Sequence, residues 1–196
     1  NCALAVDGDG DRIVLFDEKG NYLDSHHVLL LLIHYLAGYQ KQTGKVVVGF
    51  SATSKVEKLC KHYKLEVVRT PIGFKEISQL MLKEEIVAAG EESGGMTTGG
   101  YIPDRDGIWA GLIIWNCLVD SGKKLSQLME EVFAITGKFA YERLDLELNK
   151  NLRNKLIEQC RAKRFSEFGE FRIQSTEDMD GYKYFLDEYS WVMIRA

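Results

Sequence analysis

The feature that most constrains the fold is a series of short apolar segments that alternate with helix-like segments. The apolar segments cover residues 46–48, 65–68 and 86–89. Apolar residues at helical spacing mark the segments around them, at residues 25–39, 54–63, 74–82 and 107–119. Strands that are apolar on both faces are typical of parallel sheets covered by helices on both sides. The sequence therefore predicts an α/β fold, with a three-layer α/β/α domain and a mixed, mainly parallel sheet, over residues 25–138.

Both flanks of this domain have a different pattern. Residues 1–24 contain two strand-like runs joined by an acidic loop, which predicts an N-terminal hairpin. Ser126 is expected to cap the last helix of the central domain, which ends near residue 135. After Lys138 the hydrophobic period changes. The expected elements are a half-buried strand at 141–148, an amphipathic helix at 151–163 and strands at 171–174, 181–186 and 191–195. Residues 139–196 thus predict a small, incomplete α+β unit.

Composition and charge exclude several classes of protein. The chain has 196 residues and a net charge of −4, so a general attraction to nucleic acid is not expected. No apolar run reaches the ~20 residues of a membrane span, so no membrane partner is expected. The cysteines are far apart and form no C-x-x-C pair, which favours reduced thiols and a cytoplasmic location. The chain begins and ends within strand-like segments, which indicates a piece of a longer protein.

Three aspartates alternate with glycines in the loop of the predicted hairpin, at Asp7, Asp9 and Asp11. Neighbouring carboxylates repel one another unless a cation lies between them, and oxygen ligands suit Mg²⁺ or Ca²⁺. A solvated acidic turn is the simpler alternative. A calcium loop of the EF-hand kind would use the same aspartates with Glu18 at its twelfth position, but its sixth position is normally Gly and is Arg12 here. The flanks are also strand-like rather than helical, so the EF-hand alternative fails.

Three further polar segments are expected at one edge of the predicted sheet. The glycine-rich segment 90–95 contains Glu91 and Ser93, a carboxylate and a hydroxyl that suit the hydroxyls of a sugar. Lys75, after the preceding strand, offers a cation for phosphate, and Arg105 lies just before the helix at 107–119. Open α/β sheets bind ligands at the carboxyl ends of their strands. The alternatives are a mobile surface loop for residues 90–95 and a solvated side chain for Lys75.

Taken together, these segments resemble the α-D-phosphohexomutase family, the phosphoglucomutases and phosphomannomutases. The resemblance covers nearly the whole chain in order and spacing, and family members have four domains around a central cleft. Residues 7–12 match the Asp-Gly-Asp-x-Asp-Arg loop at the end of domain two. Residues 90–94 match the Gly-Glu-x-Ser-Gly loop of domain three, whose Thr-x-x-Gly segment and helix start match residues 70–73 and 106–108.

By this resemblance, residues 1–24 end domain two, residues 25–138 are the sugar-binding domain three and residues 139–196 are part of domain four. The implied ligands for Mg²⁺ are Asp7, Asp9 and Asp11, and the implied catalytic residue is Arg12. The implied substrate-binding residues are Thr70, Gly73, Lys75, Glu91, Ser93, Gly94, Arg105 and Arg195. Arg195 would begin the phosphate loop of domain four.

The resemblance also implies a reaction, the interconversion of hexose 1-phosphate and hexose 6-phosphate by an intramolecular phosphotransferase. A phosphoserine donates its phosphoryl group to the sugar, and the resulting bisphosphate returns its other phosphate to the serine. The segment that carries this serine has no counterpart in the chain, so the chain alone is expected to be inactive. The expected partners are glucose 1-phosphate, glucose 6-phosphate and, as a second class, mannose phosphates.

Departures from the family pattern bear on the substrate. In many phosphomannomutases a histidine follows the Ser-Gly of the sugar-reading loop, where this chain has Gly95 and Met96. Glu92, and Arg105 before Asp-Gly, resemble phosphoglucomutases and favour glucose over mannose. Two other functions stay open. The same loops would suit a non-catalytic module that binds a sugar phosphate, and the chain would also suit a structural α/β fragment without a ligand.

Overall fold

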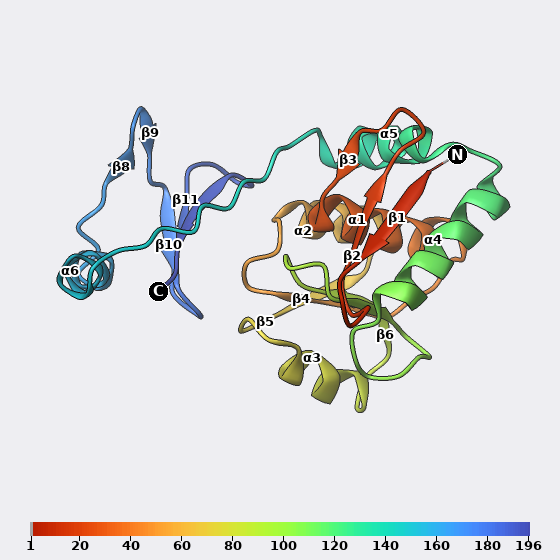
Figure 1. Cartoon of the computed structure of the whole chain (residues 1–196), viewed down its shortest axis with the longest axis horizontal. Helices are drawn as coiled ribbons and strands as arrows, with labels where there is room; N and C mark the ends of the chain where they lie inside the picture. Colours follow the sequence, from red (N-terminus) through yellow and green to blue (C-terminus); the bar gives the residue numbers. More distant parts are fainter. Residues whose placement is uncertain (1) are drawn as a thin grey trace. The chain divides into compact units, whose positions relative to one another are not determined.

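The computed structural model describes residues 2–196, which divide after Phe139 into two compact units (Figure 1). The first unit contains the N-terminal hairpin and the α/β sheet. The second contains one helix and short strands. Within the described residues no helix is long and apolar enough to cross a membrane, and the cysteines are free thiols. The cytoplasmic location expected from those cysteines stays a prediction.

The central sheet of the first unit has the strand order β5-β4-β6-β7. Its strands are β4 (Lys45–Gly49), β5 (Glu66–Thr70), β6 (Ile86–Gly90) and β7 (Met96–Thr98). The first three are parallel, and β7 pairs antiparallel with β6. The predicted mixed, mainly parallel sheet is therefore confirmed. The short β7 was not predicted, because the glycine-rich loop that precedes it masks its strand pattern.

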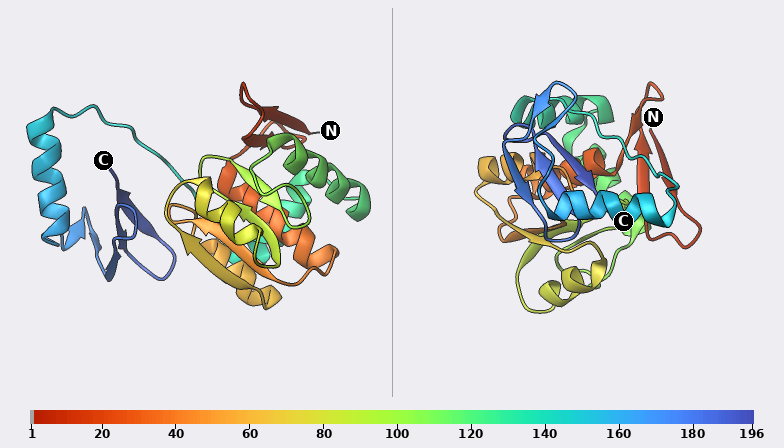
Figure 2. Two further views of the ribbon diagram at one scale, coloured as in Figure 1. Left: turned by 90° about the horizontal axis from the view of Figure 1, so that it is seen from below. Right: turned by 90° about the vertical axis from the view of Figure 1, so that its left-hand side faces the viewer.

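Helices cover both faces of this sheet (Figure 2). The covering helices are α1 (Ser25–Ile33), α2 (Lys55–Tyr63), α3 (Phe74–Met81) and α5 (Leu125–Thr136). The alternating side chains of β4 show how the two faces differ. Val46 and Val48 lie in the large core with α1, α2 and α5, whereas Val47 packs with Phe74 and Ile77 of α3. Three consecutive valines are buried because each face of the strand has its own helical cover.

The N-terminal strands form a second, antiparallel sheet that shares the large core. These strands are β1 (Ala3–Val6), β2 (Ile13–Phe16) and β3 (Tyr22–Leu23). Ile13 and Leu15 on β2 are each 1% exposed and belong to the core that α1 and α4 (Gly107–Ser121) also line. Gly111 on α4 makes this close packing possible, because a Cβ there would overlap Leu4. The hairpin is thus held firmly against the helical layer.

The predicted helix over residues 25–39 is an α-helix that ends in a π-helical turn. Asp24 caps α1, since its side chain accepts a hydrogen bond from the His27 amide at 3.0 Å. The helix then widens into η1 (His34–Tyr39). Such turns are rare and often mark a place where side chains have special partners. Here the turn carries a buried histidine into a polar cluster.

His34, in this turn, has hydrogen-bonding partners from two other elements, α2 and α5. Its Nδ1 lies 2.7 Å from the Tyr63 hydroxyl, and its Nε2 lies 3.1 Å from a Glu131 oxygen. Because an ionised carboxylate only accepts hydrogen bonds, the neutral ring carries its proton on Nε2 and accepts at Nδ1. Glu131 also accepts from Tyr39 and Lys123. Burial lowers the pKa of His34, although Glu131 acts in the opposite direction.

The second unit has the predicted α+β composition. Its elements are α6 (Lys150–Arg161), β8 (Glu167–Phe168), β9 (Phe171–Arg172), β10 (Ser175–Glu177), β11 (Tyr182–Phe185) and β12 (Trp191–Ile194). β8 pairs with β9, and β10, β11 and β12 form a three-stranded antiparallel sheet. Tyr184 on β11 and Cys160 on α6 are each 1% exposed and form the centre of this small unit.

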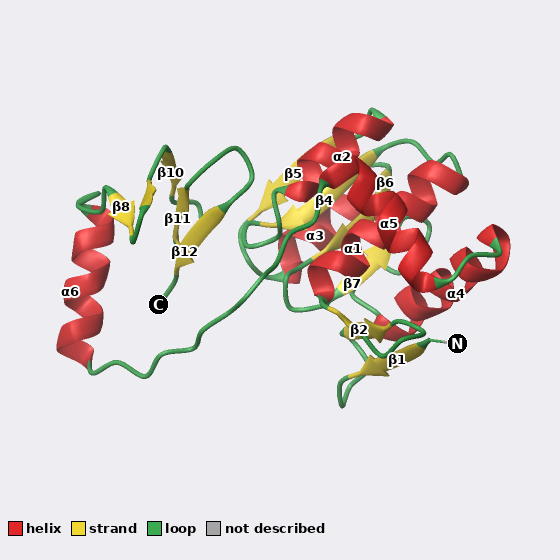
Figure 3. Ribbon diagram, turned by 90° about the horizontal axis from the view of Figure 1, so that it is seen from above, coloured by secondary structure: helices red, strands yellow, loops and turns green. Residues whose placement is uncertain are grey.

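One predicted strand is wrong. Residues 141–148 have no regular structure and belong to the loop between α5 and α6, drawn in green in Figure 3. Leu144 is 74% exposed and Leu146 is 73% exposed. These apolar side chains of the alternating segment are therefore not buried in a core. A strand also needs a partner, and no described strand pairs with this segment.

The predicted cap of α5 is also wrong. The cap is Lys124, whose backbone N–H donates to the side chain of Gln127 at 2.9 Å. Ser126 lies inside the first turn, and its hydroxyl donates to Glu18 of the hairpin. A partner 108 residues away in the sequence draws the serine into a tertiary contact that the local pattern does not reveal.

Replacing His34 with glutamine should flatten part of the pH dependence of stability. A folded-state pKa below the ordinary histidine value of 6.5 means that the unfolded chain binds more protons as the pH falls. The stabilising contribution is therefore present above about pH 6.5 and is lost as the pH falls through the folded-state pKa. Thermal unfolding followed from about pH 7.5 to about pH 5 should show a steeper loss for the wild type than for His34→Gln. His62→Gln removes an exposed histidine whose charge contributes only a small part of the His34 pKa shift, so it should flatten the curve less than His34→Gln does. Parallel curves for the wild type and His34→Gln would contradict the prediction.

Candidate functional site

The aspartate loop (residues 7–12) connects β1 to β2. One carboxylate oxygen from each of Asp7, Asp9 and Asp11 lies within 4.8 Å of the others. Gly10 adopts a φ of +75°, a conformation that favours glycine, and its N–H donates to the Asp7 carbonyl at 3.2 Å. Arg12 turns back towards the aspartates, with its Nε 3.7 Å from Asp7 Oδ2 and 3.6 Å from Asp11 Oδ1. The turn of the hairpin thus gathers the three carboxylates.

The chemistry of this group fits a hard cation. Asp11 Oδ1 is buried and has no hydrogen-bond partner among the described residues. A buried carboxylate oxygen without a hydrogen bond is costly. The Arg12 guanidinium at 3.6 Å offsets part of that cost, and a cation would offset more. Burial acts to raise the pKa of Asp7, but the backbone N–H of Arg12 and other hydrogen bonds outweigh it and lower the pKa. Asp7 is therefore ionised at neutral pH, as a metal ligand must be.

The glycine loop (residues 90–95) follows β6 and holds a buried carboxylate. Glu91 is 3% exposed, and its Oε1 accepts a hydrogen bond from the Gly73 amide at 2.8 Å. Burial raises the pKa of Glu91, although this hydrogen bond and nearby arginines act to lower it. The loop closes on itself through hydrogen bonds from the Glu91 amide to the Gly95 carbonyl at 2.9 Å and from the Gly94 amide to the Glu91 carbonyl at 3.2 Å. A raised pKa on a buried acid is common at functional sites.

The aspartate loop and the glycine loop are in direct backbone contact. The Ile13 amide donates to the Gly94 carbonyl at 3.1 Å, and Arg12 forms a β-bridge with Gly95. The start of α4 closes the third side, since the Gly107 amide donates to the Gly10 carbonyl at 2.9 Å. The three segments therefore meet at the carboxyl end of β6, the edge at which open α/β sheets bind ligands.

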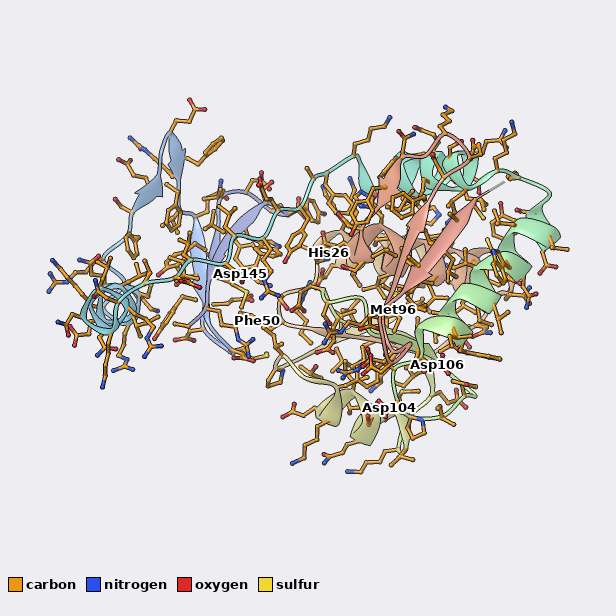
Figure 4. All side chains as sticks on the ribbon, in the orientation of Figure 1. His26, Phe50, Met96, Asp104, Asp106 and Asp145 are labelled. Atoms are coloured by element: carbon orange, nitrogen blue, oxygen red, sulfur yellow. The ribbon has the colours of Figure 1, made fainter. Side chains whose placement is uncertain are left out.

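The start of α4 is itself fixed by local hydrogen bonds. Asp106 caps the helix by accepting from the Trp109 amide at 2.8 Å, and its own amide donates to the Met96 carbonyl at 2.9 Å. Figure 4 labels Met96 and Asp106 at this junction. Tyr101 stacks on Trp109 at 4.1 Å between ring centroids and donates its hydroxyl to Asp106. These contacts hold the residue before the cap, Arg105, against both loops.

Arg105 connects the two loops through its side chain. Its Nε donates to Asp11 Oδ2, and its Nη1 lies 3.7 Å from Glu91 Oε2. Burial acts to lower the pKa of the guanidinium, but the neighbouring carboxylates, above all Asp11, outweigh it and raise that pKa. Of the residues that the resemblance implied, the structure therefore brings the aspartate loop, Glu91 and Arg105 into one cluster.

The other implied substrate residues lie at different distances from this cluster. Thr70 is buried at the end of β5, and its hydroxyl has no partner among the described residues. Gly73 joins the cluster through its amide, whereas Lys75 is exposed on the first turn of α3. Ser93 is partly buried, and Gly94 has a φ of +99° in the glycine loop. Their roles stay predictions.

Arg195 belongs to the second unit. It lies 3.3 Å from Asp180 and lines a cavity of about 350 Å³ together with Arg161. Arg195 and the cluster around Arg105 thus belong to different compact units.

Two serines support the glycine loop and were not predicted. The Ser51 hydroxyl donates to the Glu92 carboxylate, and the Ser25 hydroxyl donates to the Glu92 carbonyl. Ser51 directly follows β4, so the rule that polar residues after parallel strands share one edge points to it. Glu92 is thus hydrogen-bonded to the scaffold through both its carboxylate and its carbonyl.

Replacing Glu91 with glutamine should stabilise the folded chain at neutral pH. The raised pKa means that the folded state favours the protonated carboxyl, so stability is lost as the pH rises through that pKa. Glutamine keeps an oxygen for the Gly73 amide and carries no charge. Thermal unfolding at about pH 7.5 should occur at a higher temperature in Glu91→Gln than in the wild type. This difference in unfolding temperature should become smaller as the pH falls towards about pH 4. The exposed Glu76→Gln should unfold at the same temperature as the wild type. A Glu91→Gln variant that is less stable than the wild type at neutral pH would contradict the prediction.

Comparison with known proteins places the chain in a family. A sequence model described as phosphoglucomutase/phosphomannomutase, alpha/beta/alpha domain III, matches residues 24–135. The phosphoglucosamine mutase of Carboxydothermus hydrogenoformans is 33% identical over 131 residues, which cover 66% of this chain and 29% of that protein. The chain therefore spans less than a third of the length of this curated relative.

Solved structures share the fold. A crystal structure from Thermus thermophilus, provisionally named a phosphomannomutase, is 30% identical with a TM-score of 0.82, and the match covers 100% of this chain and 40% of that one. An Aspergillus fumigatus N-acetylphosphoglucosamine mutase, in complex with GlcNAc-6P and magnesium, is 18% identical with a TM-score of 0.54, over 66% of this chain and 35% of that one. Because the domain III model matches more than half of the chain, the chain belongs to the phosphoglucomutase/phosphomannomutase, or α-D-phosphohexomutase, family.

Proposed function

We propose that this chain is part of a phosphohexomutase that interconverts hexose 1-phosphate and hexose 6-phosphate through a phosphoserine and a bisphosphate intermediate. The observation that carries the proposal is the backbone contact between the aspartate loop and the glycine loop, with Arg105 between Asp11 and Glu91. A group that would bind a cation and a group suited to sugar hydroxyls therefore lie side by side. Phosphoryl transfer to a sugar needs both functions close together.

Mg²⁺ is the proposed cofactor, held by Asp7, Asp9 and Asp11. When bound, it would neutralise charge on the phosphoryl group that is transferred. Support comes from the three clustered carboxylates and from Asp11 Oδ1, which is buried and accepts no hydrogen bond from the described residues. The Aspergillus neighbour contains magnesium, which agrees with the proposal.

The chain's own residues would bind and orient the substrate. Arg12, whose side chain is 50% exposed beside the aspartates, can direct its guanidinium to a phosphate by paired hydrogen bonds. Glu91 and Ser93 would accept and donate hydrogen bonds to neighbouring sugar hydroxyls, in both orientations of the sugar. Lys75 is exposed and free to approach a phosphate group as a point charge. Thr70, Gly73 and Gly94 would shape the edge of the site.

None of the residues to which we assign a role in this chain acts as the covalent nucleophile of the reaction. The phosphoserine would come from another part of the longer protein, so we expect the isolated chain to show no turnover. Arg195 would contribute to a phosphate site in the same longer protein. The assignment of residues 1–24 and 139–196 to domains two and four is part of this proposal.

The proposed substrates are phosphates of glucose-type sugars, with glucose preferred over mannose. Arg105 before Asp-Gly and Glu92 in Glu-Glu-Ser favour glucose, whereas the curated relative is named a phosphoglucosamine mutase. Glucose and glucosamine share the orientation of the group at C2, and mannose differs there. Rates with the three 1-phosphates would rank them.

The second candidate function is a non-catalytic module that binds a sugar phosphate through the same loops. The sugar phosphates named for the similar proteins do not distinguish this module from an enzyme, because a module and an enzyme would bind a sugar phosphate through the same contacts. Saturable binding of glucose 1-phosphate by the full-length protein, without any turnover when Mg²⁺ is present, would favour the module.

In the full-length protein, Glu91→Ala should lower kcat/KM for glucose 1-phosphate by about 30-fold to 1,000-fold. The loss of a buried charged acceptor leaves sugar hydroxyls unpaired, which costs on the order of 2 to 4 kcal/mol, and about 1.36 kcal/mol is tenfold in rate. The exposed Glu76→Ala on α3 is the matched control and should stay within about twofold of the wild type. Steady-state kinetics decides the matter, and an unchanged kcat/KM for Glu91→Ala would end the assignment of the glycine loop to the sugar.

A further inference from the structure

Among the described residues, Arg105 connects the aspartate loop and the glycine loop through its side chain. Arg105 donates from Nε to Asp11 Oδ2 and keeps Nη1 3.7 Å from Glu91 Oε2. The Asp11 contact is a close hydrogen bond, whereas the Glu91 contact is a longer ion pair. The side chain of Arg105 is 32% exposed and that of Glu91 is 4% exposed. The guanidinium is thus shared unequally between two carboxylates.

Gly95 leaves the space that the Arg105 side chain occupies. A Cβ at position 95 would lie 2.7 Å from Arg105 Cδ and 3.4 Å from its Cβ. Gly95 is not among the glycines with a positive φ, so its backbone does not require glycine. Position 95 therefore requires glycine for its small size and not for its backbone conformation. A histidine at this position would overlap the side chain of Arg105 in its present place.

Asp11 can bind a cation while Arg105 still holds it. Arg105 occupies Oδ2. The buried Oδ1 has no hydrogen-bond partner among the described residues, and Arg12 Nε lies 3.6 Å from it. A cation on Oδ1 would share the negative charge of the carboxylate and so weaken its attraction for the guanidinium. The attraction between Arg105 and the more deeply buried Glu91 would be less affected, because the aspartates' cation is not bound to Glu91.

We propose that Arg105 is a positioning residue that couples cation binding at Asp11 to the environment of Glu91, with Gly95 leaving room for its side chain. The inference rests on the proposed function only in requiring that the aspartate loop binds Mg²⁺. When the cation binds, the interaction of the Arg105 guanidinium with Asp11 becomes weaker, and its interaction with Glu91 becomes stronger. The charged partner of the carboxylate suited to sugar hydroxyls then lies closer to it.

Two backbone amides report on the two ends of this connection. The Arg12 amide donates to Asp7 Oδ1 at 3.2 Å and reports on cation binding. The Gly73 amide donates to Glu91 Oε1 at 2.8 Å and reports on that carboxylate. Amide chemical shifts in ¹H–¹⁵N spectra of this chain, followed during titration with MgCl₂, therefore measure both events without any substrate or turnover.

In the wild type, Mg²⁺ should shift the signals of both amides along the same saturation curve. In Arg105→Met the Arg12 signal should still shift, and the Gly73 shift should be lost. Gly95→Ala should behave like Arg105→Met, and the double variant should show no further loss, because both changes remove the same contact. Arg105→Lys keeps the charge but offers a single ammonium group, so it should restore the Gly73 shift only in part.

Lys83→Met is the matched control, because it removes one positive charge from an exposed site of the same unit and should leave both shifts intact. A Gly73 shift that persists in Arg105→Met would overturn the proposal, as would a wild-type Gly73 signal that stays still while the Arg12 signal moves. If neither signal moves in the wild type, the aspartate loop binds no Mg²⁺, and the cofactor assignment fails together with the coupling. Arg105→Met leaves Gly95 in place, so it decides the question even if Gly95→Ala does not fold.

Discussion

The candidate site depends on the docking of the N-terminal hairpin against the end of the α/β sheet. Backbone hydrogen bonds from Ile13 to Gly94 and from Gly107 to Gly10 fix this docking at 3.1 Å and 2.9 Å. Such close backbone approach leaves no space for side chains. A Cβ at Gly107 would lie 2.5 Å from the Arg12 carbonyl oxygen. The glycines therefore set the distance between the aspartate loop and the glycine loop, and burial of β2 in the shared core holds it there.

Charge explains why these loops would favour a cation. When all are ionised, the carboxylates of the two loops (Asp7, Asp9, Asp11, Glu91 and Glu92) and the guanidinium groups of Arg12 and Arg105 leave three negative charges. One divalent cation would balance two of them. Without it, Asp11 Oδ1 is buried and accepts no hydrogen bond from the described residues, and burial raises the pKa of Glu91. The junction therefore contributes less to the stability of the fold than it would if every charge and polar atom were paired. Such a loss of stability is common where a site binds ligands.

The sequence predicts the sheet well because its pattern is local. Three consecutive buried valines in β4 can only be explained by cover on both faces, and the structure supplies it. Residues 141–148 were predicted wrongly because alternation alone cannot show whether a partner strand exists. The aspartate loop and the glycine loop were recognisable from their motifs. Their contact through Arg105, and the need for Gly95, depend on residues far apart in the sequence, so no local pattern could reveal them.

The central claim is that the aspartate loop and the glycine loop form one site for a metal ion and a sugar phosphate. Anomalous X-ray diffraction from crystals of the full-length protein with Mn²⁺ and glucose 1-phosphate tests it most directly, because Mn²⁺ accepts the same oxygen ligands as Mg²⁺. The account predicts one strong anomalous peak at about 2.2 Å from oxygens of Asp7, Asp9 and Asp11, with sugar hydroxyls hydrogen-bonded to Glu91. A metal peak away from the aspartates, or a sugar bound without contact to Glu91, would contradict it.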